Sequence, residues 1–131
     1  MKTISKLPKI KKILVVDDSE AIRITLKEIL ESSSIPCTIL ESENGFDAID
    51  SYKKNSPDIV IMDVYMPNTS GMKALQSILE IDKKAKVVMI TAAAKSKLVR
   101  QSIGLGAKDY ILKPFDRIMV SNIVGNVLNQ S

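Results

Sequence analysis

Four short apolar runs, each followed by a polar side chain, constrain the fold of this chain more than any other feature. The runs are Ile13–Val16, Ile59–Met62, Val87–Ile90 and Tyr110–Leu112. Such short runs without polar alternation are typical of strands buried on both faces of a parallel sheet. The polar residues that follow them are Asp17, Asp18, Asp63, Thr91 and Lys113. Because parallel strands end at the same edge, we expect these side chains to crowd the edge where open parallel sheets bind ligands.

Strand and helix patterns alternate five times along the chain. We expect strands at 12–17, 37–41, 58–63, 86–91 and 108–112, and helices at 19–32, 46–54, 70–82, 95–104 and 116–129. This alternation predicts a parallel sheet between two layers of helices. Right-handed crossovers then restrict the topology to a doubly wound α/β sheet. Within these elements we expect Ser70 to cap its helix, and Phe46 and Ile49 to face the core.

The formal net charge of +4 belongs to one end of the chain. The first twelve residues carry five lysines and no acid, whereas the remainder holds 14 of the 19 bases and all 15 acids. Nucleic-acid binding requires a basic stripe on the fold itself, so we expect no nucleic-acid partner. We therefore divide the chain into a basic lead, 1–11, and one domain, 12–131.

Targeting signals are missing from the sequence. The apolar run Ile13–Val16 is far shorter than the ~7–15 residues of a signal-peptide core, and no stretch approaches the ~20 apolar residues of a membrane span. Cys37 is the single cysteine, so no intrachain disulfide can form. We expect a cytoplasmic protein that does not insert into a membrane.

Three carboxylates at one sheet edge require a cation, because two unit charges 4 Å apart repel by ~4 kcal/mol at an effective dielectric constant of about 20. All-oxygen ligation suits Mg²⁺, with Mn²⁺ as an alternative, and the absence of histidine argues against zinc. Lys113 adds a mobile positive charge, and Thr91 adds a hydroxyl. With an aspartate nucleophile, this set fits phosphoryl transfer onto a carboxylate.

Around these residues the chain resembles the receiver domain of bacterial two-component response regulators. The matching segments are 12–19, 57–67, 90–92 and 106–115, in the order and spacing of the family. The resemblance implies a flavodoxin-like (CheY-like) fold with five parallel strands in the order 2-1-3-4-5. It also implies a stand-alone receiver without an output domain, a phosphoacceptor rather than an enzyme, capable at most of self-phosphotransfer and autodephosphorylation.

The resemblance also assigns roles to individual residues. Asp63 resembles the phosphoacceptor, and Asp17 and Asp18 resemble the acidic pair that holds Mg²⁺ together with Asp63. The backbone carbonyl of Tyr65 would complete the protein ligands. Lys113 resembles the lysine that meets the phosphoryl group, and the family commonly has a cis peptide bond before Pro114.

A switch and a partner face follow from the same resemblance. Thr91 resembles the switch hydroxyl, and Tyr110 resembles the aromatic residue whose ring moves with it. We expect the partner face on helix 95–104, strand 108–112 and helix 116–129. Its residues would be Lys95, Lys97, Arg100, Lys108, Tyr110 and Arg117.

Two positions depart from the family. Position 65 is often small or polar and is Tyr65 here, and position 93 is often polar or aromatic and is Ala93 here. Both flank the site, so we expect them to control the water that hydrolyses the phosphorylated form, and Tyr65 to lengthen its life.

The implied partners are proteins. A sensor histidine kinase or a histidine phosphotransfer protein would donate the phosphoryl group, and a downstream protein target would bind the partner face. The stretch 81–115 is similar to stand-alone chemotaxis receivers. A phosphorelay intermediate and a degenerate receiver acting as an unphosphorylated scaffold remain alternatives. We expect a monomer.

Two other protein classes, and one local role for Asp18, account for parts of the same pattern. A haloacid-dehalogenase-type phosphatase needs an acid two residues after its nucleophile, where this chain has Tyr65. A flavodoxin-like phosphate site needs a loop rich in Ser, Thr and Gly after the first strand, where this chain has two acids, Asp17 and Asp18. Asp18, taken by itself, fits the N-cap of the first helix.

Overall fold

Five strands and five helices alternate in the computed structural model, which describes residues 9–66, 70–92 and 97–130. The strands are β1 (Lys11–Val16), β2 (Cys37–Ser42), β3 (Ile59–Asp63), β4 (Val87–Thr91) and β5 (Asp109–Leu112). The helices are α1 (Glu20–Glu31), α2 (Gly45–Asn55), α3 (Gly71–Ile81), α4 (Lys97–Leu105) and α5 (Arg117–Leu128). All strand pairs are parallel and their order is β2-β1-β3-β4-β5. The predicted fold class and strand order are confirmed.

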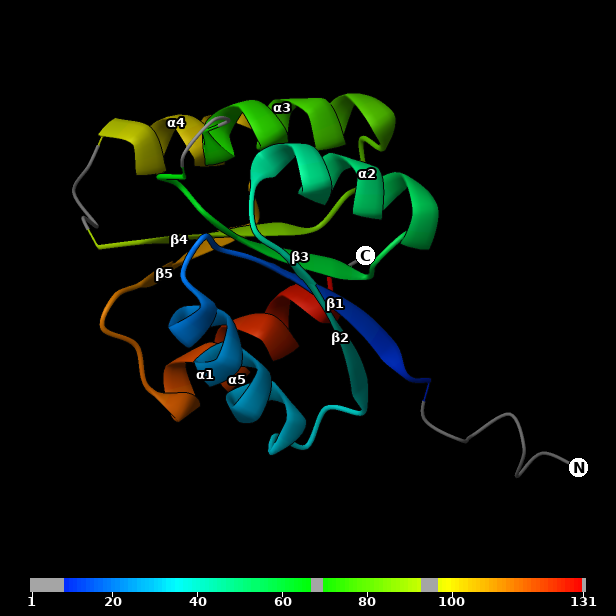
Figure 1. Cartoon of the computed structure of the whole chain (residues 1–131), viewed down its shortest axis with the longest axis vertical. Coiled ribbons are helices and arrows are strands. Elements are labelled where there is room, and N and C mark those ends of the chain that lie inside the picture. The colour runs from blue at the N-terminus through cyan, green and yellow to red at the C-terminus, as the bar shows by residue number, and fades with distance from the viewer. Residues whose placement is uncertain (1–8, 67–69, 93–96, 131) are drawn as a thin grey trace, which may run out of the picture.

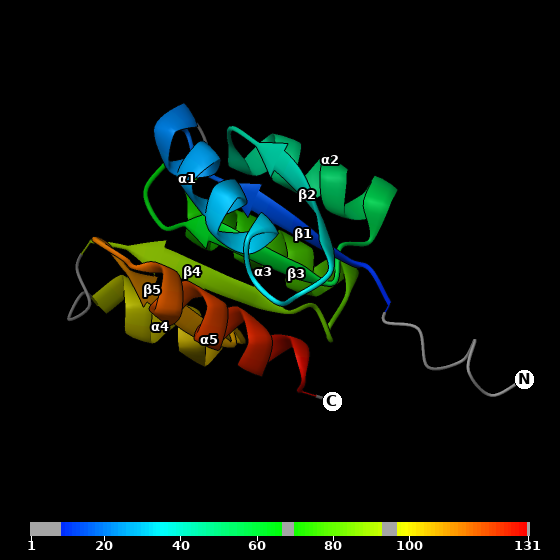
Figure 2. The ribbon, with the colours of Figure 1, turned by 90° about the horizontal axis from the view of Figure 1, so that it is seen from below.

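Two layers of helices cover the sheet (Figures 1 and 2). Helices α2, α3 and α4 lie on one face, and α1 and α5 lie on the other. Successive strand residues point to opposite faces, so Leu14 and Val16 join the core under α2 and α3, whereas Ile13 and Val15 join the core under α1 and α5. Both faces of the sheet centre are apolar, which is why β1, β3 and β4 appear in the sequence as apolar runs.

Four helices begin with a side-chain cap. The side chains of Ser19, Asn44, Ser70 and Asp116 each accept a hydrogen bond from the backbone N–H three residues later, which satisfies a donor that the helix leaves unpaired. The predicted cap at Ser70 is confirmed. Ser19, not Asp18, caps α1, so Asp18 stays available for the sheet edge.

The expected inward position of Phe46 is wrong. Its side chain is 60 % exposed, because α2 turns the face with Gly45, Ala48 and Tyr52 toward the core. Phe46 follows Gly45 by one residue and is therefore rotated by about 100° from that face. Ile49 packs against the core as expected.

Element ends otherwise lie within one or two residues of the expected ranges. The start expected for α4 at residue 95 lies outside the described residues. None of the described helices combines the length and the apolar character that crossing a membrane requires.

Candidate functional site

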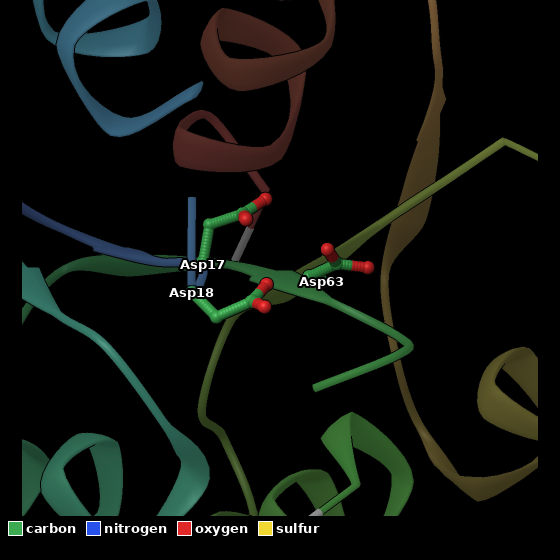
Figure 3. A group of neighbouring side chains, drawn as sticks. All are labelled: Asp17, Asp18 and Asp63. Atoms are coloured by element: carbon green, nitrogen blue, oxygen red, sulfur yellow. The ribbon is translucent and has the colours of Figure 1, made fainter. Parts of the chain in front are cut away.

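The predicted site residues lie at the carboxyl edge of the sheet, on four neighbouring strands. Asp17 and Asp18 follow β1, Asp63 and Thr91 are the last residues of β3 and β4, and Lys113 follows β5. Figure 3 shows Asp17 and Asp18 projecting from the end of β1, beside Asp63. One carboxylate oxygen from each of the three lies within 4.8 Å of the other two. The expectation that the three carboxylates meet at this edge is confirmed.

Lys113 joins two of the three carboxylates. Its Nζ donates to Oδ2 of Asp63 at 3.1 Å and to Oδ2 of Asp17 at 3.4 Å. Burial lowers the pKa of Lys113, but the hydrogen bonds and charges of Asp63 and Asp17 outweigh burial and raise it overall. Lys113 therefore stays cationic between the two acids. The peptide bond between Lys113 and Pro114 is cis, as the resemblance implied.

The other oxygens of the two buried carboxylates accept backbone hydrogen bonds. Oδ1 of Asp63 accepts from the N–H of Tyr65 at 3.0 Å, and Oδ1 of Asp17 accepts from the N–H of Ser19 at 2.9 Å. An aspartate that bonds the backbone two residues later forms a tight local turn. Each carboxylate is therefore held from both sides, by a backbone N–H and by Lys113.

Burial and neighbouring negative charge make ionisation of Asp17 unfavourable. Asp17 is 1 % exposed, and burial is the largest effect that raises its pKa, from 3.8 to about 6. The Ser19 N–H opposes this rise, the charge of Asp63 adds to it, and Lys113 opposes it. Two acids and one ammonium leave a surplus of negative charge, to which the exposed Asp18 adds.

The donor set fits a hard divalent cation. Three carboxylates offer only oxygen, which matches the ligand preference of Mg²⁺ and its habit of retaining water. No histidine is present anywhere in the sequence, and the described carboxylate group contains no thiolate. The geometry of the described residues therefore suits Mg²⁺ or Mn²⁺ better than zinc.

Gly71 has a structural role that sequence reasoning did not identify, since glycine beside a helix start is ordinarily a turn residue. It is the first residue of α3, and its N–H donates to the carbonyl of Val64 at 3.0 Å. A Cβ at this position would lie 2.1 Å from the backbone oxygen of Asp63. Only glycine lets α3 approach the backbone of Asp63 this closely.

Arg23 is a second residue that sequence reasoning missed, because an arginine one turn into a helix ordinarily lies in solvent. Here it is 7 % exposed. Its Nη1 donates to the backbone carbonyl of Asp17 at 2.7 Å, and its Nε donates to Oε1 of Glu41 at 3.0 Å. No motif in the sequence marks this contact.

Of the two positions expected to control the hydrolytic water, the structure describes one, Tyr65. The side chain of Tyr65 is 57 % exposed and lines an open pocket of about 470 Å³ together with Met66, Met72 and Leu98. Ala93 lies outside the described residues.

The expected switch residues lie near the site at different depths. Thr91 is buried, and its carbonyl accepts from the N–H of Lys113 at 2.8 Å. Tyr110 is half-buried on β5 and packs against the core under α2, α3 and α4. Four members of the expected partner face, Lys97, Arg100, Lys108 and Arg117, are exposed. Lys95 lies outside the described residues.

Comparison with known proteins identifies relatives of the whole domain. The family model described as "Response regulator receiver domain" matches residues 13–124. Protein CcdB of Bacillus subtilis is 44 % identical over 117 residues, which cover 89 % of this chain and 97 % of that protein. Chemotaxis protein CheY of the same organism is 39 % identical over 118 residues, 90 % and 98 % of the two chains. Sporulation initiation phosphotransferase F of B. subtilis is 34 % identical over 105 residues, 80 % and 83 % of the two chains.

Solved structures agree with the sequence relatives. CheY in a CheX–CheY–BeF3–Mg²⁺ complex from Borrelia burgdorferi is 35 % identical, with a TM-score of 0.84 over 92 % of this chain and 90 % of that one. A response regulator receiver domain protein from Clostridium thermocellum is 29 % identical, with a TM-score of 0.84 over 92 % and 95 % of the two chains.

Proposed function

The chain belongs to the response regulator receiver domain family and is a phosphoacceptor signalling protein, and from this premise we propose that Asp63 accepts the phosphoryl group. The donor is a phosphohistidine on a sensor histidine kinase or a histidine phosphotransfer protein. The observation that carries the proposal is the convergence of Asp17, Asp18 and Asp63 within 4.8 Å, with Lys113 joined to Asp63.

In the transfer step, a carboxylate oxygen of Asp63 attacks phosphorus. The bond between phosphorus and the histidine nitrogen breaks, and its electron pair stays on the imidazole. The Tyr65 N–H and Lys113 hold the Asp63 carboxylate in a fixed orientation before attack, which lowers the entropic cost of the step. Lys113 then turns its positive charge to the phosphoryl oxygens.

The metal of this site would be Mg²⁺, held by the carboxylates of Asp17, Asp18 and Asp63 and by the backbone carbonyl of Tyr65. When bound there, Mg²⁺ neutralises the charge that gathers on the transferred group. Asp17 meanwhile keeps Lys113 on the side of the Asp63 carboxylate through its own ion pair.

Phosphorylation changes the partner face through Thr91 and Tyr110. The added charge draws the Thr91 hydroxyl and Lys113 toward the site, and the ring of Tyr110, half-buried on β5, follows. β5 is an edge strand, and α4 and α5 flank it from opposite faces (Figure 2). A downstream protein that reads α4, β5 and α5 therefore senses the state of Asp63. The names of the CheY relatives favour chemotaxis as the pathway.

A phosphorelay intermediate is the second candidate, because one relative is named a sporulation initiation phosphotransferase. In that role the phosphoryl group would pass from Asp63 to a histidine on another protein. Transfer of label from the phosphorylated chain to a purified histidine phosphotransfer protein distinguishes the two pathways.

Labelling with acetyl phosphate tests the phosphoacceptor directly. Wild type, Asp63→Asn and the matched control Asp50→Asn, an exposed aspartate on α2, are incubated with and without Mg²⁺. We expect label on wild type and Asp50→Asn in Mg²⁺ only. Equal labelling in EDTA, or label retained by Asp63→Asn, contradicts the assignment, and a wild type that accepts no label supports the scaffold alternative.

A further inference from the structure

We propose that Arg23 is a positioning residue for the metal site, acting through the peptide bond that joins Asp17 to Asp18. This inference rests on the proposed function, because it concerns how the same acidic pair is held for Mg²⁺. Arg23 touches neither carboxylate of the pair. It donates its Nη1 to the backbone carbonyl between them, at 2.7 Å.

The geometry of the peptide unit explains why this contact matters. A peptide bond is planar and rigid, so the direction of the Asp17 carbonyl sets the orientation of the whole plane between the two Cα atoms. That plane in turn sets the directions in which the Asp17 and Asp18 side chains leave the backbone. Holding one carbonyl therefore positions two candidate ligands at once.

Arg23 can hold this carbonyl because it is itself anchored. Its Nε donates to Oε1 of Glu41 at 3.0 Å, and its Nη2 lies 3.7 Å from Oε1 of Glu43. The Arg23 side chain is 9 % exposed, and those of Glu41 and Glu43 are 38 % and 73 % exposed. Glu41 is the stronger anchor, because it is the less exposed of the two acids and the only one of them within hydrogen-bond distance of Arg23 among the described residues.

The loop after β1 is thus fixed on several sides. The N–H of Asp17 donates to the carbonyl of Ser42 at 3.2 Å, and the Asp17 carboxylate accepts from Ser19. Arg23 adds the third constraint and ties the loop to the end of β2, an edge strand. Only arginine suits this position, since its planar fork presents several donors in one fixed geometry and lysine offers a single point charge.

The charge of Arg23 and its effect on ligand positions would change Mg²⁺ affinity in opposite directions, so an experiment can distinguish them. Arg23 is a cation beside a cation site, so its charge alone repels Mg²⁺, and removing that charge would tighten Mg²⁺ binding. If Arg23 instead positions the acidic pair, removing it weakens Mg²⁺ binding. Residues that orient metal ligands from behind typically change metal affinity by about 10–100-fold when mutated.

Isothermal titration calorimetry with MgCl₂ measures the dissociation constant of each variant. We expect Arg23→Gln and Arg23→Lys to raise it by at least about tenfold, and Glu41→Gln to raise it by a smaller factor. Lys27→Gln, which removes a positive charge one turn further along α1, and Glu28→Gln, which removes an exposed acid from α1, serve as controls and leave it unchanged.

Labelling with acetyl phosphate across a Mg²⁺ series gives a second readout. Positioning predicts that half-maximal labelling needs more Mg²⁺ in Arg23→Lys, while the rate at saturating Mg²⁺ falls much less. A general loss of structure would lower the saturating rate instead. Circular dichroism verifies the fold of each variant. If Arg23→Gln does not fold, Arg23→Lys decides, because it keeps the positive charge and removes the planar fork that holds the Asp17 carbonyl.

Folded Arg23 variants that bind Mg²⁺ as tightly as wild type, or more tightly, overturn this inference alone. A wild type that neither binds Mg²⁺ nor accepts label on Asp63 overturns the proposed function and this inference with it.

Discussion

At the scale of single residues, the Tyr65 ring is the feature most open to a kinetic test. The Tyr65 backbone N–H holds Asp63, whereas the residue as a whole is 57 % exposed and lines an open apolar pocket. We predict that the ring restricts the water that attacks the acyl phosphate, so Tyr65→Asn loses phosphate faster. A tenfold change in rate needs only about 1.4 kcal/mol of barrier. Autodephosphorylation of both proteins under equal Mg²⁺ measures the effect.

Phe46 supplies the control for this prediction, since it is another exposed aromatic residue. Phe46→Asn is expected to decay at the wild-type rate. Ala93→Glu, which introduces a group able to orient water, is expected to decay faster. Equal or slower loss of phosphate from Tyr65→Asn removes any role for the ring.

Asp17 gives a second prediction at this scale, for the metal-free protein. Its pKa is raised from 3.8 to about 6 by burial, so folded Asp17 keeps its proton to a higher pH than unfolded Asp17. Ionisation therefore favours the unfolded chain, and the Asp17 contribution to the unfolding free energy falls as the pH rises from 3.8 to about 6. A difference of about two pH units corresponds to about 3 kcal/mol.

We accordingly expect Asp17→Asn to be more stable than wild type at pH 7 in EDTA, by up to about 3 kcal/mol, and to lack this pH dependence. Urea unfolding at pH 4 and pH 7 measures both, with Asp50→Asn as the matched control. Added Mg²⁺ should stabilise wild type more than Asp17→Asn. A less stable Asp17→Asn at pH 7 contradicts the electrostatic account of the site.

At the scale of elements, the position of α3 depends on Gly71, the first residue of the helix, which has no side chain. Gly71→Ala places a Cβ 2.1 Å from the backbone oxygen of Asp63, so the helix must shift. We expect a loss of about 1–3 kcal/mol in unfolding free energy, the range typical of overpacking, together with slower labelling of Asp63.

Gly125 on α5 is the matched control, because a Cβ there meets no atom within 4 Å. Gly125→Ala is expected to stabilise the protein by about 0.5–1 kcal/mol, the helix preference of alanine over glycine. Urea unfolding of the two variants should therefore give opposite signs. A neutral Gly71→Ala shows that α3 tolerates displacement.

Strands that are buried on both faces could be located from the sequence. Both faces of β3 and β4 are buried, so each appears as an unbroken apolar run whose end locates Asp63 and Thr91. The face of α2 could not be predicted, since its core contacts come from Gly45 and Ala48, which carry little hydrophobic signal. The Arg23 contact was hidden for a related reason: its partners, the Asp17 carbonyl and Glu41, become neighbours only when β1 and β2 pair.

At the scale of the whole molecule, phosphorylation should reach the far edge of the sheet. Asp63 gains about one negative charge on phosphorylation, and Lys113 links it to the segment after β5. We predict that the stable mimic beryllofluoride, added with Mg²⁺, shifts amide resonances across residues 95–117. Two-dimensional NMR measures these shifts, with Asp63→Asn as the control. Shifts confined to the loops at 17, 63 and 91 contradict long-range switching.

The path of α5 has a practical consequence for tethering. Figure 1 shows that β1 begins and α5 ends at the edge of the sheet where the strands start, whereas Asp63 ends β3 at the other edge. The Nζ of Lys86, just before β4, donates to the carbonyls of Leu128 and Gln130 at 3.0 and 2.6 Å. A fluorescent protein or a biosensor surface joined to the end of α5 would lie on the side of the sheet away from Asp63. Such an attachment would allow the binding and release of a partner protein to be measured without blocking access to Asp63.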